Sequence, residues 1–257
     1  MKSHIQINQS ILDRFSNKKE IYTEGHRSLV DYVEFFNLKD FTFGIEKVKD
    51  FGTKEDYYES DVEKDLLSTK IEGPFGNVCK KINKSIELSN FALTQKEKET
   101  IINYAFYSCR RSENGIDKVI DFFAKHGIRK TPSDVLRTEL DLNKAFPYKT
   151  VSILVNESSE DFIIPFNCLI YVTLFGYKCC VLPISPKKAL CLSTNSDTEN
   201  TCLVTQISST ELINEINLAC FDVEKRNMNL VVFKSKETII KLCNLKHIKI
   251  NYKECDA

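Results

Sequence analysis

Two adjacent arginines, Arg110 and Arg111, are the strongest cationic feature of the chain. An arginine side chain presents a planar fork that binds carboxylate or phosphate through two hydrogen bonds, so the pair is a candidate anion site. A second interpretation needs no ligand, because both residues end a helical pattern and cations stabilise the C-terminal end of a helix. The sequence favours this second interpretation and leaves the first open.

Three carboxylates between residues 60 and 72 are candidates for an acid–base or metal-binding pair. Glu63 and Glu72 are nine residues apart, which places them on opposite faces of a regular α-helix. Asp65 and Glu72 are seven apart and share a face if the helix stays straight. Because Gly73-Pro74 follows at once and interrupts the helix, neither pair is assigned a metal or proton-transfer role.

Neither the histidines nor the cysteines have the spacing of metal ligands. The four histidines form no H-x-x-x-H and the ten cysteines form no C-x-x-C. Most cysteines lie in apolar runs and are predicted to be free, buried thiols, among them Cys79, Cys109, Cys220 and Cys243. The chain also lacks a glycine-rich phosphate loop and a G-x-S-x-G elbow. We therefore predict no metal and no cofactor, and residue chemistry alone indicates no reaction.

The amino-acid composition limits the kinds of partner that the chain is expected to bind. The chain has 36 basic and 36 acidic residues, so no net field attracts nucleic acid, although short basic clusters leave a local interface open. The first residues lack an apolar signal core, and no apolar run approaches the roughly 18 residues of a membrane span. We expect a cytoplasmic protein in a reducing compartment, with no membrane segment and with an unidentified ligand or protein partner.

The first half of the chain is predicted to be mainly helical. The capping boxes Ser60–Glu63 and Thr94–Glu97 open two helices, the first interrupted at Gly73-Pro74 and the second ending near Arg111. His126-Gly127 ends a third helix and Thr131-Pro132 begins a fourth. The predicted helices run over about 60–82, 94–111, 117–125 and 131–145.

The second half is predicted to form a small, mostly antiparallel sheet. Its runs TVSILVN, DFIIPF, CLIYVTLF, KCCVLPI, ALCLS and CLVTQI are rich in β-branched and aromatic residues and predict four to six strands. Glu157–Asp161 is a candidate hairpin loop, and Pro183 and Pro186 should prevent one uninterrupted central strand around Ser185. A capping box at Ser208–Glu211 opens another helix. A last strand and helix are expected over about 230–233 and 236–244.

These elements predict an α+β fold: one domain over residues 1–257, with a helical half (about 1–147) packed on a sheet-containing half (about 148–257). Short motifs along the chain, in order, resemble a bacterial family, the domain-of-unknown-function family 4238. The segments that carry the resemblance are HIQINQSILDRF, LLSTKIE, YAFYSCRR, LPISP and EINLA. The residues that match the family pattern are His4, Gln6, Leu12, Phe15, Leu67, Ile71, Glu72, Tyr104, Arg111, Pro183, Ser185, Pro186 and Asn217.

The chain departs from the family pattern at two positions. Ser108 stands where the family has glutamine, and the family's S-D-N-P is replaced by Pro165-Phe166-Asn167-Cys168, in which only Asn167 fits. The aspartate is missing at Phe166. If that aspartate carries an activity in relatives, this chain is altered or inactive.

The resemblance itself implies no established reaction, so two functional hypotheses of different classes stay open. In the first, preferred one, the chain is a ligand-binding, partner-binding or sensor module, with phage defence as one setting, and Gln6, Asn167, Ser185 and Asn217 contribute to binding. In the alternative, the chain is a hydrolase, for example a nuclease or toxin-like effector. The catalytic residues would then be His4 as general base, Glu72, and Arg111 as the clamp for phosphate or carboxylate.

Overall fold

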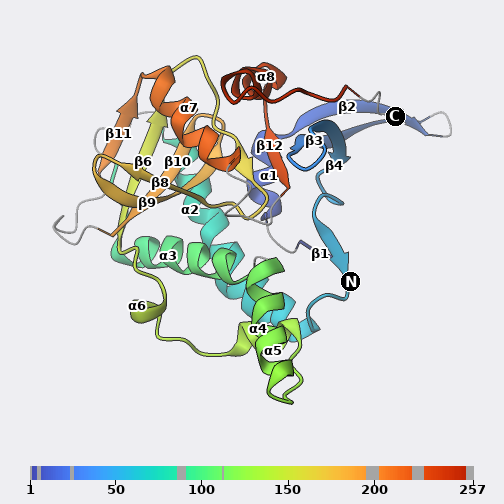
Figure 1. Cartoon of the computed structure of the whole chain (residues 1–257), viewed down its shortest axis with the longest axis vertical. Helices are drawn as coiled ribbons and strands as arrows, with labels where there is room; N and C mark the ends of the chain where they lie inside the picture. Colours follow the sequence, from blue (N-terminus) through green and yellow to red (C-terminus); the bar gives the residue numbers. More distant parts are fainter. Residues whose placement is uncertain are drawn as a thin grey trace.

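The protein folds around two five-stranded β-sheets and a group of helices that packs against them (Figure 1). The computed structural model describes residues 2–4, 7–23, 26–85, 91–111, 113–194, 203–221 and 229–252. The mixed α+β class predicted from the sequence is confirmed. The assignment of the chain to a single domain stays a prediction.

The first sheet is built from the second half of the chain, where the sequence predicted it. Its strand order is β11-β6-β10-β9-β8, antiparallel throughout except that β11 runs parallel to β6. The strands are β6 (Thr150–Asn156), β8 (Ile170–Leu174), β9 (Tyr177–Ser185), β10 (Lys188–Ser193) and β11 (Val204–Ile207). Each overlaps a run that the β-branched and aromatic pattern had marked, although β9 extends one residue beyond its run at each end and β10 begins one residue before its run.

Alternate residues of this sheet enter two different cores. Cys180 and Leu182 pack with the core on the side of α1, α2 and α3, whereas Val181 and Cys191 pack with the core on the side of α7 and α8. Successive side chains of a strand point to opposite faces, and here both faces are covered. The central strands are therefore apolar almost without interruption.

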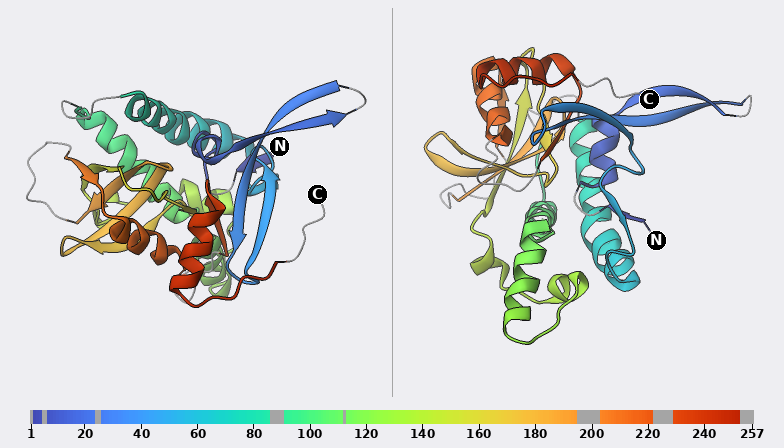
Figure 2. Two further views of the ribbon diagram at one scale, coloured as in Figure 1. Left: turned by 90° about the horizontal axis from the view of Figure 1, so that it is seen from above. Right: turned by 45° about the vertical axis from the view of Figure 1, so that its right-hand side comes forward.

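The second sheet combines the two ends of the chain. Its order is β2-β3-β12-β7, with β4 also pairing with β3, and a separate pair joins β1 to β5. The strands are β1 (Lys2–His4), β2 (Asn17–Thr23), β3 (His26–Asn37), β4 (Thr42–Lys47), β5 (Thr53–Glu55), β7 (Ile164–Pro165) and β12 (Leu230–Phe233). The hairpin of β2 and β3 projects from the body of the molecule (Figure 2).

The prediction of a mainly helical first half is therefore wrong for residues 17–55. This region carries β-branched and aromatic residues in β3, where Val33 and Phe36 are buried. Its central strand pairs with β12, almost two hundred residues later in the chain. Strands that pair over such a distance leave no local pattern in the sequence, whereas a capping box does.

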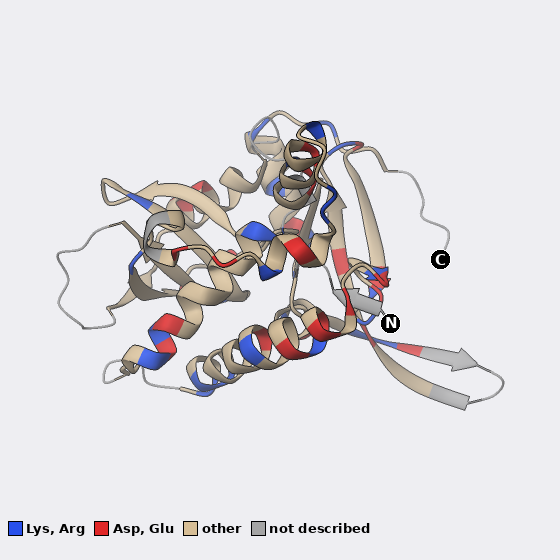
Figure 3. Ribbon diagram, turned by 90° about the horizontal axis from the view of Figure 1, so that it is seen from below, with Lys and Arg blue, Asp and Glu red and all other residues tan. Residues whose placement is uncertain are grey.

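Helices make up most of the remaining described chain. They are α1 (Gln9–Phe15), the π-helix η1 (Val62–Glu72), α2 (Gly73–Lys84), α3 (Gln95–Arg110), α4 (Glu113–Lys125), α5 (Pro132–Arg137), α6 (Leu142–Ala145), α7 (Thr210–Leu218), the 3₁₀ turn η2 (Ala219–Phe221) and α8 (Lys236–Leu245). Basic and acidic residues are interspersed along them, as Figure 3 shows. Among the described helices, none combines the length and the apolar character that a bilayer span requires.

Several predicted helix ends need correction. Asp61, not Ser60, is the N-cap of η1, and its side chain makes no capping bond. Ser209, not Ser208, caps α7 by accepting a hydrogen bond from the backbone N–H of Leu212. The helix expected over 131–145 is two short helices, because α5 ends at Arg137, with Thr138 as its C-cap.

The helix predicted to break at Gly73-Pro74 changes there from π to α geometry. The backbone N–H of Gly73 donates to the carbonyl of Ser68, five residues back. Proline has no N–H to offer and is well tolerated in the first turn of an α-helix. The junction therefore accommodates Pro74 at the start of α2.

One expectation about the strands is also wrong. Residues 157–161 are not a hairpin loop, because they lead from β6 in one sheet to β7 in the other. The break expected around Ser185 is confirmed, because β9 ends at Ser185 and the chain turns back into β10 at Lys188. Pro183 itself lies within β9, an interior strand. Proline is tolerated there because the pairing of β8 with β9 stops at Val181, and the ladder with β10 shifts register near the same point.

All eight described cysteines are free, as predicted, and seven of them are buried. Cys109 is the exception, since it is exposed at the end of α3. Burial raises the pKa of the Cys79 thiol to about 12.

Thiol labelling of the native protein at pH 8 should reflect this difference. Iodoacetamide should modify Cys109 quickly and should modify Cys79 only after unfolding, because a buried protonated thiol is a poor nucleophile. Peptide mass spectrometry after a short exposure measures both sites in one sample. Equal labelling of the two would contradict the buried position of Cys79.

The capping box at the start of α3 is confirmed and gives a stability prediction. Thr94 Oγ1 accepts from the N–H of Glu97 at 3.2 Å, and Glu97 Oε2 accepts from the N–H of Thr94 at 2.8 Å. Thr94→Ala should lower the free energy of unfolding by about 1 kcal/mol in urea denaturation. Thr100→Ala, which removes a hydroxyl from the interior of the same helix, should have little effect. Equal losses would show that the cap contributes nothing specific.

Candidate functional site

Two of the residues predicted to be catalytic, Glu72 and Arg111, form a buried ion pair. Arg111 Nη1 lies 2.6 Å from Glu72 Oε1. The arginine side chain is 1% exposed and the glutamate side chain 17%. Glu72 is the last residue of η1 and Arg111 follows the last residue of α3, so the pair joins the ends of two helices.

The ion pair keeps Arg111 charged in spite of its burial. Burial by itself lowers the pKa of Arg111, because it removes the guanidinium from water. The Glu72 carboxylate raises that pKa, and Tyr104 and Tyr58 act in the same direction, so the net pKa is above its usual value. A charge buried this deeply is tolerated only when it is paired.

Aromatic and thiol groups complete this buried centre. Tyr104 stacks on Phe75 with 3.7 Å between the ring centroids, and its hydroxyl lies 3.8 Å from Cys168 Sγ. Burial raises the pKa of Tyr104, and it raises the pKa of the Cys168 thiol to about 12. Burial also raises the pKa of Tyr58, whose hydroxyl has no hydrogen-bond partner among the described residues.

The backbone around this centre is unusual in two places. A π-helix as long as η1 is rare, and Cys168 has a φ of 66°, in the left-handed region. The π geometry also overturns the expectation that Glu63 and Glu72 lie on opposite faces. A π-helix turns more slowly than an α-helix, so residues nine apart are roughly two turns apart. Both carboxylates also raise the pKa of Tyr58, although burial is the main cause of its shift.

This buried centre is built to hold the structure together. Its arginine is enclosed and bonded to a carboxylate, and a thiol with a pKa of about 12 is protonated near neutral pH. Asp65, the other carboxylate considered with Glu72, is exposed on η1 and takes no part in it. Among the described residues, no group of His, Cys, Asp and Glu is arranged to hold a metal ion.

The structure also describes Asn167 and the backbone of His4, two of the other predicted residues. Asn167 precedes Cys168 and stabilises a local turn, because its Oδ1 accepts a hydrogen bond from the N–H of Leu169 at 3.2 Å. The backbone of His4 pairs with Thr53 at the end of β1. Gln6 lies outside the described residues.

Asn217 and Ser185 belong to a second polar region, around residues 161–163. Asn217 on α7 is fully buried, accepts from the N–H of Ile163 at 3.1 Å and donates to the carbonyl of Asp161 at 2.8 Å. Ser185 ends β9, and the next carbonyl, that of Pro186, accepts from the N–H of Phe162 at 2.8 Å. The matched residues are thus divided between at least two places.

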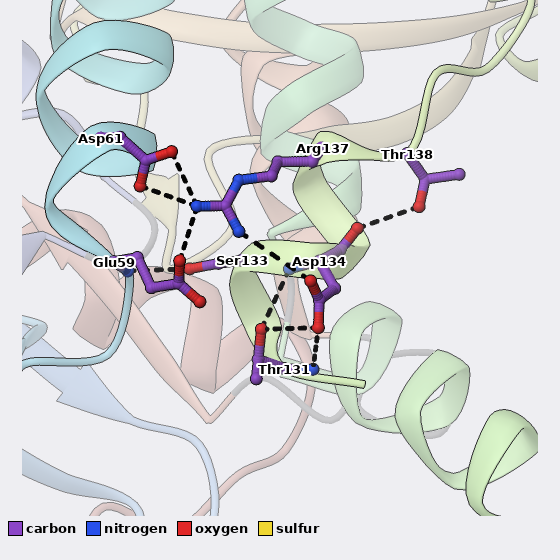
Figure 4. Close-up of polar contacts among 7 residues, drawn as sticks. All are labelled: Glu59, Asp61, Thr131, Ser133, Asp134, Arg137 and Thr138. Atoms are coloured by element: carbon purple, nitrogen blue, oxygen red, sulfur yellow. Dashed lines mark hydrogen bonds and ion pairs between the residues drawn. The ribbon is translucent and has the colours of Figure 1, made fainter. Parts of the chain in front are cut away.

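A third polar cluster, shown in Figure 4, fixes the start of η1 to α5. Arg137 Nη2 binds Glu59 at 2.6 Å and Asp61 at 2.7 Å, and Ser133 Oγ accepts from the N–H of Glu59 at 2.8 Å. The hydrogen bond with Arg137 lowers the pKa of Asp61. These groups are largely exposed, so water and salt screen the contacts.

No family model, curated protein or solved structure matches this chain. The site must therefore be judged from its own geometry.

An open groove of about 640 Å³ lies between β8, α7 and α8. We call it the β8 groove. Its apolar surface includes Val172, Leu218 and Leu245, and charges of both signs border it, among them Glu215 and Lys246. Its volume is within the range of small-molecule and peptide sites.

One amide in the β8 groove stands out. Asn214 lines the groove and is 8% exposed, and its Oδ1 has no hydrogen-bond partner among the described residues. Buried polar atoms are almost always satisfied, so this exception beside an open space makes Asn214 a candidate ligand contact. Sequence patterns did not single out Asn214, because an asparagine in a helix of mixed polarity usually faces solvent.

The buried ion pair predicts a large loss of stability when one partner is removed. Glu72→Gln should lower the free energy of unfolding by about 3 kcal/mol, because it leaves the Arg111 charge buried without its counterion. Adding Arg111→Met should recover part of that loss, since the charge is then gone.

The matched control is Glu59→Gln, which weakens the exposed cluster of Figure 4. It should change stability far less, and only at low salt. Urea denaturation of the four proteins gives the comparison. A similar small loss for Glu72→Gln and Glu59→Gln would refute the structural importance of the buried pair.

Proposed function

We propose that the chain is a ligand- or partner-binding module whose binding site is the β8 groove. The observation that carries this proposal is the groove itself, an open space of about 640 Å³ that is lined by apolar residues and by Asn214, whose Oδ1 is buried without a hydrogen-bond donor among the described residues. Apolar residues around it supply the contact area, and one well-placed polar group fixes orientation, which is the usual composition of a ligand site.

The burial of Arg111 favours a binding module over a hydrolase. Arg111 is enclosed, so a substrate phosphate cannot reach it without opening the protein core. Asn167 and Asn217, expected from the resemblance to bind a ligand, are both engaged with backbone groups, so the binding site is proposed elsewhere. These residues act as a framework, which agrees with the missing aspartate at Phe166.

The framework has a direct connection with the proposed site. Asn217 and Asn214 are three residues apart on α7, and Asn217 binds α7 to the segment 161–163 from both ends of its amide. This fixes the position of α7 above β8. The resemblance to family 4238 and a cytoplasmic setting remain part of the proposal.

The proposal is tested by comparing Asn214→Leu with wild-type protein. A mixture of free amino acids, nucleotides and short peptides is screened by two-dimensional NMR for saturable shifts of groove residues. Asn214→Leu should abolish them, because leucine has similar volume and no acceptor. Asn244→Leu, on the exposed face of α8 outside the groove, should keep them.

The opposite outcome is equally specific. If wild-type protein hydrolyses nucleic acid, nucleotides or esters, and folded Arg111→Lys loses that activity while Asn214→Leu retains it, the chain is a hydrolase and the binding proposal is wrong. Thermal unfolding of each variant, measured first, separates loss of function from loss of fold.

A further inference from the structure

The β8 groove wraps around the edge of a sheet. Among the described strands, β8 is the last of its sheet and pairs only with β9. The groove is lined by three consecutive residues of β8: Tyr171, Val172 and Thr173. Consecutive side chains of a strand point to opposite faces, so a space that touches all three lies beside the backbone edge.

The backbone of Thr173 points towards this space. Thr173 pairs with Lys178 on β9, and the carbonyl of Lys178 accepts from the N–H of Thr194, on the β10 side. The N–H and C=O of one strand residue point to the same side, so Lys178 makes no ladder bonds with β8. In an antiparallel pair of this kind, the groups of the partner residue point outward. Thr173 thus presents a donor and an acceptor at the edge.

Helices border the space beside Thr173. Helix α7 and the turn η2 both contact β8, so they cover one face of its edge (Figure 1). A single extended chain, whose backbone lies about 4.8 Å from its neighbour, needs less room beside this edge than a second sheet with its own covering helices.

We propose that the β8 groove binds an extended peptide segment of a partner protein, which adds to β8 as a further strand. This inference rests on the proposed binding function and names its ligand class. The peptide backbone bonds the N–H and C=O of Thr173, as in other cases of strand addition. Alternate side chains of the peptide face α7 and α8.

The groove also specifies the side chains of this peptide. One that faces Asn214 carries an N–H or O–H donor, as serine, threonine, asparagine or glutamine does. A neighbouring position is apolar and contacts Leu218 and Leu245. Because Glu215 and Lys246 border the groove, a peptide with charges of both signs fits better than a strongly acidic or basic one.

The test uses the full chain and a phage-displayed library of random octapeptides. Selected peptides should bind with a measurable Kd and should slow amide hydrogen exchange at Thr173. Thr173→Pro removes the outward N–H and should weaken binding at least about tenfold, the effect of roughly one lost hydrogen bond. Thr173→Val keeps that N–H and should bind as the wild type does.

A matched control exists on the opposite edge of the same sheet. The carbonyls of Leu203 and Ile207 accept from N–H groups of Ile153 and Glu157, so the backbone of Gln206, between them, points away from β6. Gln206→Pro is therefore the same change at the other edge, and it should leave peptide binding unaltered. A loss as large as that of Thr173→Pro would refute addition at β8.

The remaining outcomes separate this inference from the proposed function. In one outcome no peptide is enriched, but small molecules shift the NMR signals of groove residues in the wild type and not in Asn214→Leu. That outcome refutes a peptide as the ligand class and supports the binding module. If neither peptides nor small molecules bind at the groove, both the peptide inference and the proposed binding function are wrong. Association of the chain with itself that Thr173→Pro abolishes would show a second copy, not a partner peptide, at this edge.

Discussion

The buried charge of Arg111 constrains the arrangement of the helices and of the turn around it. A guanidinium that is 1% exposed needs a counterion, and Glu72 supplies it from the end of η1. The π geometry of η1 keeps Glu63 on the same side as Glu72, and Cys168 adopts a left-handed conformation next to Tyr104. The ends of η1 and α3 and the turn after β7 are thereby fixed relative to one another.

The turn after β7 connects the two sheets in the chain. The ion pair therefore influences the arrangement of both sheets. Residues 164–165 form β7, which pairs with β12 in the second sheet, and Ile170 begins β8 at the edge of the first. The segment between them contains Asn167 and Cys168. Contacts that hold this short segment also fix how the two sheets meet, and hence where β8 presents its edge.

Sequence patterns predicted the elements whose signals are local. The strands of the first sheet follow from β-branched runs, and the start of α3 follows from a threonine and a glutamate three residues apart. The second sheet was missed because β3 needs β12, which is distant in sequence. Arg111 was recognised as the main cation, but its partner Glu72 is 39 residues away, a relation that no helical spacing encodes.

Two asparagines on one helix show how framework and candidate site differ physically. Both amide atoms of Asn217 are bonded to the backbone of residues 161 and 163, so its burial is compensated within the chain. Asn214, one turn away, buries an acceptor for which the described residues provide no donor. An unsatisfied buried acceptor costs about 1–3 kcal/mol. In the proposed binding mode, a ligand donor that bonds this acceptor would remove that penalty, so the helix that Asn217 holds in place would contribute, at Asn214, part of the free energy for binding.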